Sequence, residues 1–285
     1  MASEEILGVI ITFNPEIPAL LGNLACITQQ VTKVVIIDNH SSNWSQWKEL
    51  AGNNAILIRN ETNVGIAAAL NQGLAFAAGN GFRYFISFDQ DSSPGENMVA
   101  VLYQAFLQTG KHTAITGPVY EDFRLGASMN QHTISSAGVI SPALTLITSG
   151  ALYRTDIILS AGGFCEKLFI DYVDFELCLR LHQQNYLCYI TRNAVLYHQL
   201  GNSGMRTFAG IRFIITNHSP LRRYYLIRNK IIIWKKYGVK LPGWVARDVL
   251  STLKTIFGML LFEKQRWSKF KSMIKGMING ITTSI

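Results

Sequence analysis

Short apolar segments alternate with helical patterns along the first ninety residues. The apolar segments share continuous hydrophobicity without polar alternation, and they are Ile6–Thr12, Lys33–Ile37, Ala55–Arg59 and Tyr84–Phe88. Helical patterns cover residues 16–30 and 64–78. Strands that are apolar throughout are typical of a parallel sheet covered on both faces. We therefore predict an α/β fold with a Rossmann-like, doubly wound and mostly parallel sheet.

The pattern is less regular after residue 110. Residues 111–142 predict loops and short strands. Thr145–Tyr153 predicts a strand that is broken at Ser149-Gly150, and Arg154–Ala161 predicts a helix. Two further strands are predicted for Tyr186–Ile190 and Ala194–Tyr197.

Polar side chains follow the predicted strands of the first half, and they are Asn14, Asp38, Asn63, Asp89 and Asp91. Ligands of doubly wound folds bind outside the carboxyl ends of the strands. Asp89 and Asp91 are two residues apart, so on an extended segment their carboxylates point the same way. Such hard oxygen ligands suit Mg²⁺ or Mn²⁺ bound together with substrate phosphates. The pattern predicts a metal–nucleotide site, with a solvated acidic turn as the alternative.

A second acidic stretch contains Asp171, Asp174 and Glu176, directly before a helical pattern. It fits an ordinary helix start, with Asp174 as N-cap and Glu176 near the positive end of the helix dipole. It also fits a general base held ionised at a helix N-terminus. His198, at the end of a predicted strand, is either a structural residue or a third metal ligand.

Charge is distributed unevenly along the chain. Residues 1–221 hold 12 Lys and Arg against 16 Asp and Glu, a net charge of −4 (12 − 16). Residues 222–285 hold 14 against 2, a net charge of +12 (14 − 2). This asymmetry predicts that the C-terminal part meets an anionic surface.

Apolar positions between residues 244 and 277 recur at steps of three and four, with Lys and Arg beside them. This predicts an amphipathic helix or helix pair at a membrane interface. Two alternatives are packing of the apolar face on the sheet domain and nucleic-acid binding, although no nucleic-acid motif accompanies the charge. No apolar run approaches the roughly 20 residues that span a bilayer.

We accordingly predict a catalytic domain over residues 1–220 and a basic, membrane-associating helical region over residues 221–285. Glu4 and Glu5 precede the first strand without a basic segment, which disfavours a signal peptide. The four cysteines form no C-x-x-C pair and are expected to be reduced. The expected location is cytoplasmic, peripheral on the inner face of the cell membrane.

The order and spacing of several stretches resemble the family 2 inverting glycosyltransferases of the GT-A fold, and within them the bacterial rhamnosyltransferases. The stretches are VIITFNP (9–15), VIIDNHSS (35–42), NETNVGIAAALNQG (60–73), FDQDS (88–92), and GGFCEKLFIDYVDFELCLR (162–180) followed by LYHQLGNS (196–203). Together they extend over about residues 6–203, and RRYYLIRN (222–229) is also similar.

The resemblance implies a role for each matching polar position. Asp38 would contact the nucleobase, and the nucleotide would be lined by Thr12, Asn14, Asn63 and Gly65. Asp89 would lie near the ribose and the metal, which would be Mg²⁺ or Mn²⁺. Asp91 and His198 would complete the metal site.

Asp174 lies where the family keeps its catalytic base. Family members often have a pair of acids at this point, whereas this chain has Val173 followed by Asp174. Asp171 is therefore a rival for the same role.

The implied activity is metal-dependent, inverting transfer of a sugar to a lipid-linked oligosaccharide of an O-antigen, capsule or cell-wall polysaccharide. The implied donor is a nucleotide sugar, dTDP-L-rhamnose. The alternatives are a non-catalytic sugar-nucleotide-binding subunit and a haloacid-dehalogenase-like phosphatase, whose D-x-D motif ends the first strand rather than about the fourth. Whether the protein forms a homo-oligomer is left open.

Overall fold

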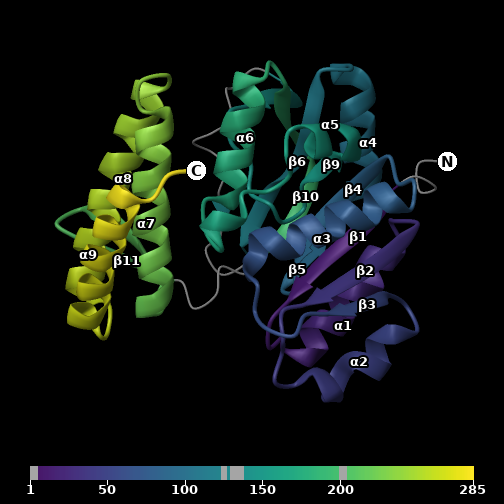
Figure 1. Ribbon diagram of the computed structural model, residues 1–285, viewed down its shortest axis with the longest axis horizontal. Coiled ribbons are helices and arrows are strands. Elements are labelled where there is room, and N and C mark those ends of the chain that lie inside the picture. The colour runs from purple at the N-terminus through teal and green to yellow at the C-terminus, as the bar shows by residue number, and fades with distance from the viewer. Residues whose placement is uncertain (1–5, 123–126, 129–137, 199–203) are drawn as a thin grey trace. The chain divides into compact units, whose positions relative to one another are not determined.

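A computed structural model describes residues 6–122, 127–128, 138–198 and 204–285 of the chain (Figure 1). Contacts divide the chain into two compact units. The first, here called the sheet unit, extends to Phe169 and resumes at Val173 through the strand that ends at His198. The second, here called the helical unit, consists of Ile170–Tyr172 and the chain from Gly204 onward.

One mixed sheet forms the centre of the sheet unit, with the strand order β3-β2-β1-β4-β9-β6-β10-β5. Its first four strands are mutually parallel and are β1 (Ile6–Thr12), β2 (Lys33–Asp38), β3 (Ile56–Arg59) and β4 (Tyr84–Asp89). The remaining strands are β5 (Ser92–Pro94), β6 (Thr113–Asp122), β7 (Ala127–Ser128), β8 (Ile140–Ala143), β9 (Leu152–Arg154) and β10 (Leu187–His198). β6 and β10 are parallel to each other, whereas β5 and β9 pair antiparallel to their neighbours.

Helices cover both faces of the parallel half of the sheet (Figure 1). One face packs against α1 (Ile17–Thr28), α2 (Trp44–Gly52) and α4 (Met98–Thr109), in a core that includes Ile10 and Ile36. The other face packs against α3 (Gly65–Gly79), where Gly73 lies directly against Val9. Because alternate strand residues face opposite sides, continuous hydrophobicity is needed to fill both layers. The predicted doubly wound α/β fold is confirmed.

The four parallel strands and helices α1 and α3 were predicted to within a few residues, whereas α2 between β2 and β3 was not predicted. The strand predicted over Thr145–Tyr153 is present only at its end, in β9, and the predicted break at Ser149-Gly150 is confirmed. Gly150, with φ of +74°, turns the chain there, and its N–H donates to the Ser87 carbonyl. The two strands predicted near residues 186–197 form one strand, β10, whose pairing with β6 shifts between Ile190 and Val195.

The helical unit contains a hairpin of β11 (Gly204–Phe208) and β12 (Ile211–Ile215), followed by α7 (Pro220–Tyr237), α8 (Pro242–Phe262) and α9 (Arg266–Thr282). α9 packs closely along α7, where Gly276 and Gly280 lie against backbone atoms of Tyr224 and Arg228. No helix among the described residues is long and apolar enough to span a membrane.

A buried ionic cluster joins the helices of this unit. Glu263 accepts from Arg223 at 2.6 Å and from Lys269 at 2.7 Å, and all three side chains are at most 5% exposed. Burial tends to raise the pKa of Glu263, but the hydrogen bond from Lys269 and the charge of Arg223 keep that pKa below its usual value. A buried carboxylate is tolerated because two cations neutralise it.

We predict that Gly276→Ala lowers the free energy of unfolding by about 1–3 kcal/mol, because the added methyl group meets the α7 backbone. This loss outweighs the better helix propensity of alanine. Urea unfolding followed by circular dichroism measures it. Gly243→Ala is the matched control, since a methyl group there meets no atom within 4 Å. Equal stability of the two variants would contradict the close approach of α9 to α7.

Candidate functional site

The strand register brings several predicted residues to one edge of the sheet. Thr12 of β1 is opposite Asp38 of β2, and Ile11 of β1 is opposite Asp89 of β4. Because these strands are parallel, their carboxyl ends meet at the same edge. Thr12, Asp38 and Asp89 therefore lie at one edge of the sheet, with Thr12 and Asp38 on one face and Asp89, in register with Ile11, on the other.

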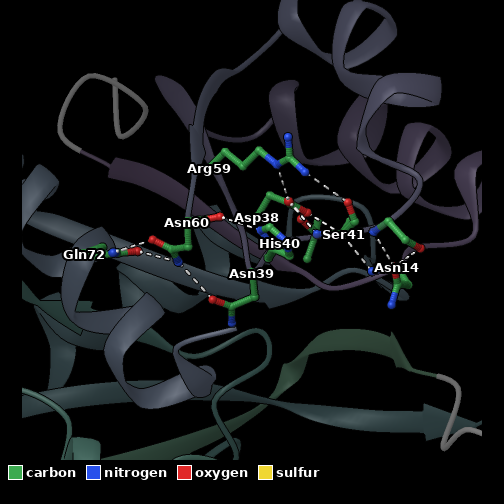
Figure 2. Close-up of polar contacts among 10 residues, drawn as sticks. Asn14, Asp38, Asn39, His40, Ser41, Arg59, Asn60 and Gln72 are labelled. Atoms are coloured by element: carbon green, nitrogen blue, oxygen red, sulfur yellow. Dashed lines mark hydrogen bonds and ion pairs between the residues drawn. The ribbon is translucent and has the colours of Figure 1, made fainter. Parts of the chain in front are cut away.

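Asp38 is fully buried and its carboxylate accepts several hydrogen bonds (Figure 2). Thr12 Oγ1 donates to Oδ1 at 3.0 Å, and the Ser41 N–H donates to Oδ2 at 2.9 Å. The Ser41 hydroxyl also donates to Oδ1, and Arg59 Nε lies 3.7 Å from Oδ2. A buried carboxylate needs such partners. They hold its side chain in one orientation at the strand end.

Asn14 connects the loop after β1 to the loop after β2 (Figure 2). Its N–H donates to Ser41 Oγ at 2.8 Å, and its Oδ1 accepts from the N–H and the hydroxyl of Ser42, both at 2.8 Å. Its φ of +49° is a left-handed conformation that asparagine tolerates better than most residues. The two loops are therefore held together.

Three amide side chains that sequence analysis did not single out continue this network. Gln72 Nε2 donates to Asn60 Oδ1 at 2.7 Å, and Asn60 Nδ2 donates to Asn39 Oδ1 at 2.9 Å. Asn39 Nδ2 in turn donates to the Gly65 carbonyl at 3.3 Å. Asn39 and Asn60 each lie just after a strand in the sequence, which is the signal that could have identified them.

Asn63 and Gly65 shape the start of α3. The Gly65 N–H donates to Asn63 Oδ1 at 3.0 Å, in the local turn that asparagine favours. Gly65 has φ of +85°, and a Cβ there would collide with the Phe169 ring. The Phe169 carbonyl accepts from the Ile66 N–H at 2.7 Å. Gly65 is required by both backbone conformation and space.

The turn between the two acids of the D-x-D motif is bound to β1 and α1 through its middle residue. Gln90 Oε1 accepts from the Phe13 N–H at 2.8 Å. The Gln90 carbonyl accepts from Asn23 Nδ2 at 2.9 Å. On either side of Gln90, Asp89 is half-buried and Asp91 is exposed.

Ser149 connects the two ends of the same turn, and sequence analysis did not identify it. The Asp89 N–H donates to Ser149 Oγ at 3.1 Å, and the Ser149 hydroxyl donates to Ser92 Oγ at 2.8 Å. Ser149 and Ser92 are both buried. No local pattern predicts these contacts, because they join residues about 60 positions apart.

The predicted metal ligands fit a hard divalent cation in their chemistry. Asp89 and Asp91 supply carboxylate oxygens, and Mg²⁺ or Mn²⁺ commonly takes one or two of these plus phosphate oxygens. The backbone register places His198 opposite Ser92, but the His198 side chain lies outside the described residues. Among the described side chains, no group of three His, Cys, Asp or Glu is arranged to hold a metal.

Asp174 lies within the first turn of α6 (Val173–Gln183), one residue past its start and not at the N-cap that the helix-start interpretation expected, and its Oδ1 accepts from the Phe175 N–H at 2.8 Å. The pKa of the buried Tyr120 hydroxyl is shifted by its surroundings. Burial raises the pKa of Tyr120 well above its usual value, and the charges of Asp174 and Asp89 raise it further.

Asp171 belongs to the helical unit and has different partners. Arg222 donates to its two oxygens at 3.0–3.3 Å. The main chain here is strained, since Asp171 and Tyr172 both have φ above +60°. Asn229 Nδ2 holds this segment by donating to the carbonyls of Ile170 and Asp171 at 2.7 and 2.8 Å.

We predict that Ser149→Ala lowers the free energy of unfolding by about 1–2 kcal/mol, because two buried hydrogen bonds are lost. It should also weaken Mn²⁺ binding, since the turn carrying Asp89 and Asp91 loses a support. Denaturant unfolding and calorimetric titration with Mn²⁺ measure the two effects. Ser160→Ala removes an exposed hydroxyl that bonds only the Ile157 carbonyl and should leave both quantities nearly unchanged. Identical behaviour of the two variants would contradict the role of Ser149.

Comparison with solved structures gives likenesses of fold. GalNAc-T7, crystallised with UDP, GalNAc and Mn²⁺, superimposes with a TM-score of 0.58 at 14% identity, over 82% of this chain and 48% of that one. Residues 1–349 of TarS from S. aureus give a TM-score of 0.55 at 16% identity, over 97% of this chain and 71% of that one. This chain spans about half of GalNAc-T7. The predicted GT-A architecture is confirmed.

Comparison of sequences identifies a relative over nearly the full length. The chain is 29% identical over 292 aligned residues to the dTDP-rhamnosyl transferase RfbF of Shigella flexneri, covering 98% of this chain and 96% of the relative. The family model described as "Glycosyl transferase family 2" matches residues 9–158, which is more than half of the chain and includes β1 to β4. The chain belongs to glycosyl transferase family 2.

Proposed function

We propose that the protein transfers L-rhamnose from dTDP-L-rhamnose, with inversion, to a hydroxyl group of a lipid-linked saccharide. The observation that carries the proposal is the position of Thr12, Asp38 and Asp89 together at the carboxyl edge of the sheet. Family membership supports glycosyl transfer, and the near full-length similarity to a dTDP-rhamnosyl transferase supports this donor. The product would serve an O-antigen, a capsule or a cell-wall polysaccharide.

One set of residues binds the nucleotide-sugar donor, and another residue acts on the acceptor. Asp38, with Thr12 and Asn14 beside it, binds the nucleoside, and Asn63 and Gly65 line the nucleotide. Asp89, Asp91 and His198 would hold Mg²⁺ or Mn²⁺, and a metal bound there would supply positive charge to stabilise the departing diphosphate.

Asp174 removes the proton from the acceptor hydroxyl. The acceptor oxygen forms a bond to the anomeric carbon while the bond from that carbon to the diphosphate breaks on the opposite face. The proton ends on the Asp174 carboxylate, so no covalent sugar–enzyme intermediate is needed. Asp171 fits this role less well, because Arg222 occupies both of its oxygens.

Family membership removes one earlier alternative, the haloacid-dehalogenase-like phosphatase. The second alternative is a sugar-nucleotide-binding subunit without catalysis. It differs from the enzyme in a measurable way, since it would bind the donor without releasing nucleoside diphosphate in the presence of acceptor.

We predict that nucleoside diphosphate is released from dTDP-L-rhamnose in the presence of Mg²⁺ or Mn²⁺ and a membrane extract as acceptor. UDP- and GDP-sugars should give at most a few per cent of that rate, and EDTA should abolish it. A coupled assay for nucleoside diphosphate measures the reaction. Release of nucleoside diphosphate from a UDP-sugar instead would show that dTDP-L-rhamnose is the wrong donor. Binding of a donor without any release of nucleoside diphosphate would favour the non-catalytic sugar-nucleotide-binding subunit.

We predict that Asp174→Asn lowers the transfer rate by at least about a hundredfold, as expected for loss of a general base. Donor affinity, measured by calorimetry, should stay within about twofold. Asp171→Asn is the matched control, because it removes a neighbouring carboxylate whose partner is Arg222. The assignment is wrong if Asp171→Asn abolishes transfer and Asp174→Asn does not.

A further inference from the structure

Helix α8 has two apolar faces with different surroundings. Ile256, Met259 and Leu260 face inward and pack in a cluster with residues of α7 and α9. A second set remains 39–66% exposed and consists of Leu250, Leu253, Phe257 and Leu261, here called the α8 stripe. Steps of three and four residues place this set along one line of the helix. Packing inside the unit therefore accounts for one face and leaves the other unexplained.

The hairpin extends this apolar surface. Phe213 of β12 is buried against α8, where Gly258 lies against it and the Phe257 ring is 5.8 Å away, centroid to centroid. Ile211 is two residues from Phe213, so it points to the same side of the hairpin. It pairs in register with Phe208, and both are about half-exposed. The exposed apolar surface thus continues from Phe257 toward the end of the hairpin.

The acids of the helical unit are neutralised internally. Its described part contains Asp171, Asp248 and Glu263, and these pair with Arg222, with Lys230, and with Arg223 and Lys269. Residues 204–285 hold 16 Lys and Arg. Exposed cations of α8, α9 and the turn between them are Lys254, Lys264, Arg266, Lys271 and Lys275. The surface of the unit is therefore strongly cationic.

The exposed apolar surface and the positive charge together indicate what kind of partner this unit binds. A second copy of this surface would bring positive charge against positive charge. Nucleic acid would match the charge, but single strands bind mainly by stacking bases on aromatic rings, and three of the four residues of the α8 stripe are leucines. An anionic bilayer matches both properties, since acyl chains accept aliphatic side chains and headgroups attract Lys and Arg.

We propose that the α8 stripe, with Phe208 and Ile211 of the hairpin, inserts into the headgroup region of an anionic membrane, with α8 parallel to the bilayer plane. This deepens the proposed function, since it rests on the lipid-linked acceptor proposed there, and it names the residues that enter the lipid. A helix of this kind lies in the interface without crossing the bilayer.

Flotation of the full chain with vesicles tests the proposal in the absence of donor, so its result is separate from that of the transfer assay. We expect binding to phosphatidylcholine vesicles containing about one quarter phosphatidylglycerol, and weak binding to phosphatidylcholine alone. Leu253→Asp should lower the bound fraction at least about tenfold, because a charge replaces an apolar side chain that enters the lipid. Joint Lys271→Glu and Lys275→Glu replacement should also weaken binding about tenfold or more.

Leu107→Asp is the matched control, since Leu107 on α4 and Leu253 are both 58% exposed. It should bind vesicles like the unchanged chain, and circular dichroism should show that all variants are folded. The proposal is overturned if the unchanged chain fails to float with anionic vesicles, or if Leu253→Asp floats equally well. It is also overturned if Leu253→Asp instead dissociates a dimer in sedimentation, or abolishes binding to single-stranded DNA.

Discussion

The parallel register of β1 with β2 and β4 is the constraint on which the donor side of the candidate site depends. Thr12 is opposite Asp38, and Ile11 is opposite Asp89. A shift of either pairing by one residue would turn the polar side chain to the other face of the sheet. The register is held because both faces of β1 are filled, with Gly73 of α3 against Val9 and Ile27 of α1 near Gly8. Packing of apolar layers thereby sets the positions of the carboxylates.

The loops at this edge are joined more extensively than their separate sequences indicate. Asn14 connects the loops after β1 and β2, and the amides of Asn39, Asn60 and Gln72 connect β2 and β3 to α3. A preorganised site of this kind loses little conformational entropy when a nucleotide binds. The buried Asp38 carboxylate is the centre of this network because its charge requires several donors.

The sequence was informative wherever the signal is local. Continuous hydrophobicity identified β1 to β4, and the polar residues that follow placed Asp38, Asp89 and Asp91 at or just after the ends of β2 and β4. It was uninformative where a contact joins distant positions, as with Ser149, whose hydroxyl bonds residues about 60 positions earlier. For α8 the sequence was partly informative. Periodicity predicted an amphipathic helix, but only the packing showed which apolar residues face inward and which remain exposed.

Under the proposed function, the two bonds of Gln90 have a consequence for engineering donor specificity. Its side chain binds the Phe13 backbone at the end of β1, and its carbonyl binds Asn23 of α1. A loop for a different nucleobase, grafted between β1 and α1 from a relative, would therefore also disturb the segment that carries Asp89 and Asp91. Such a chimera needs a compatible residue at position 90 and a donor at position 23. Exchanging the β1–α1 loop together with the D-x-D turn is the smallest transplant that preserves these bonds.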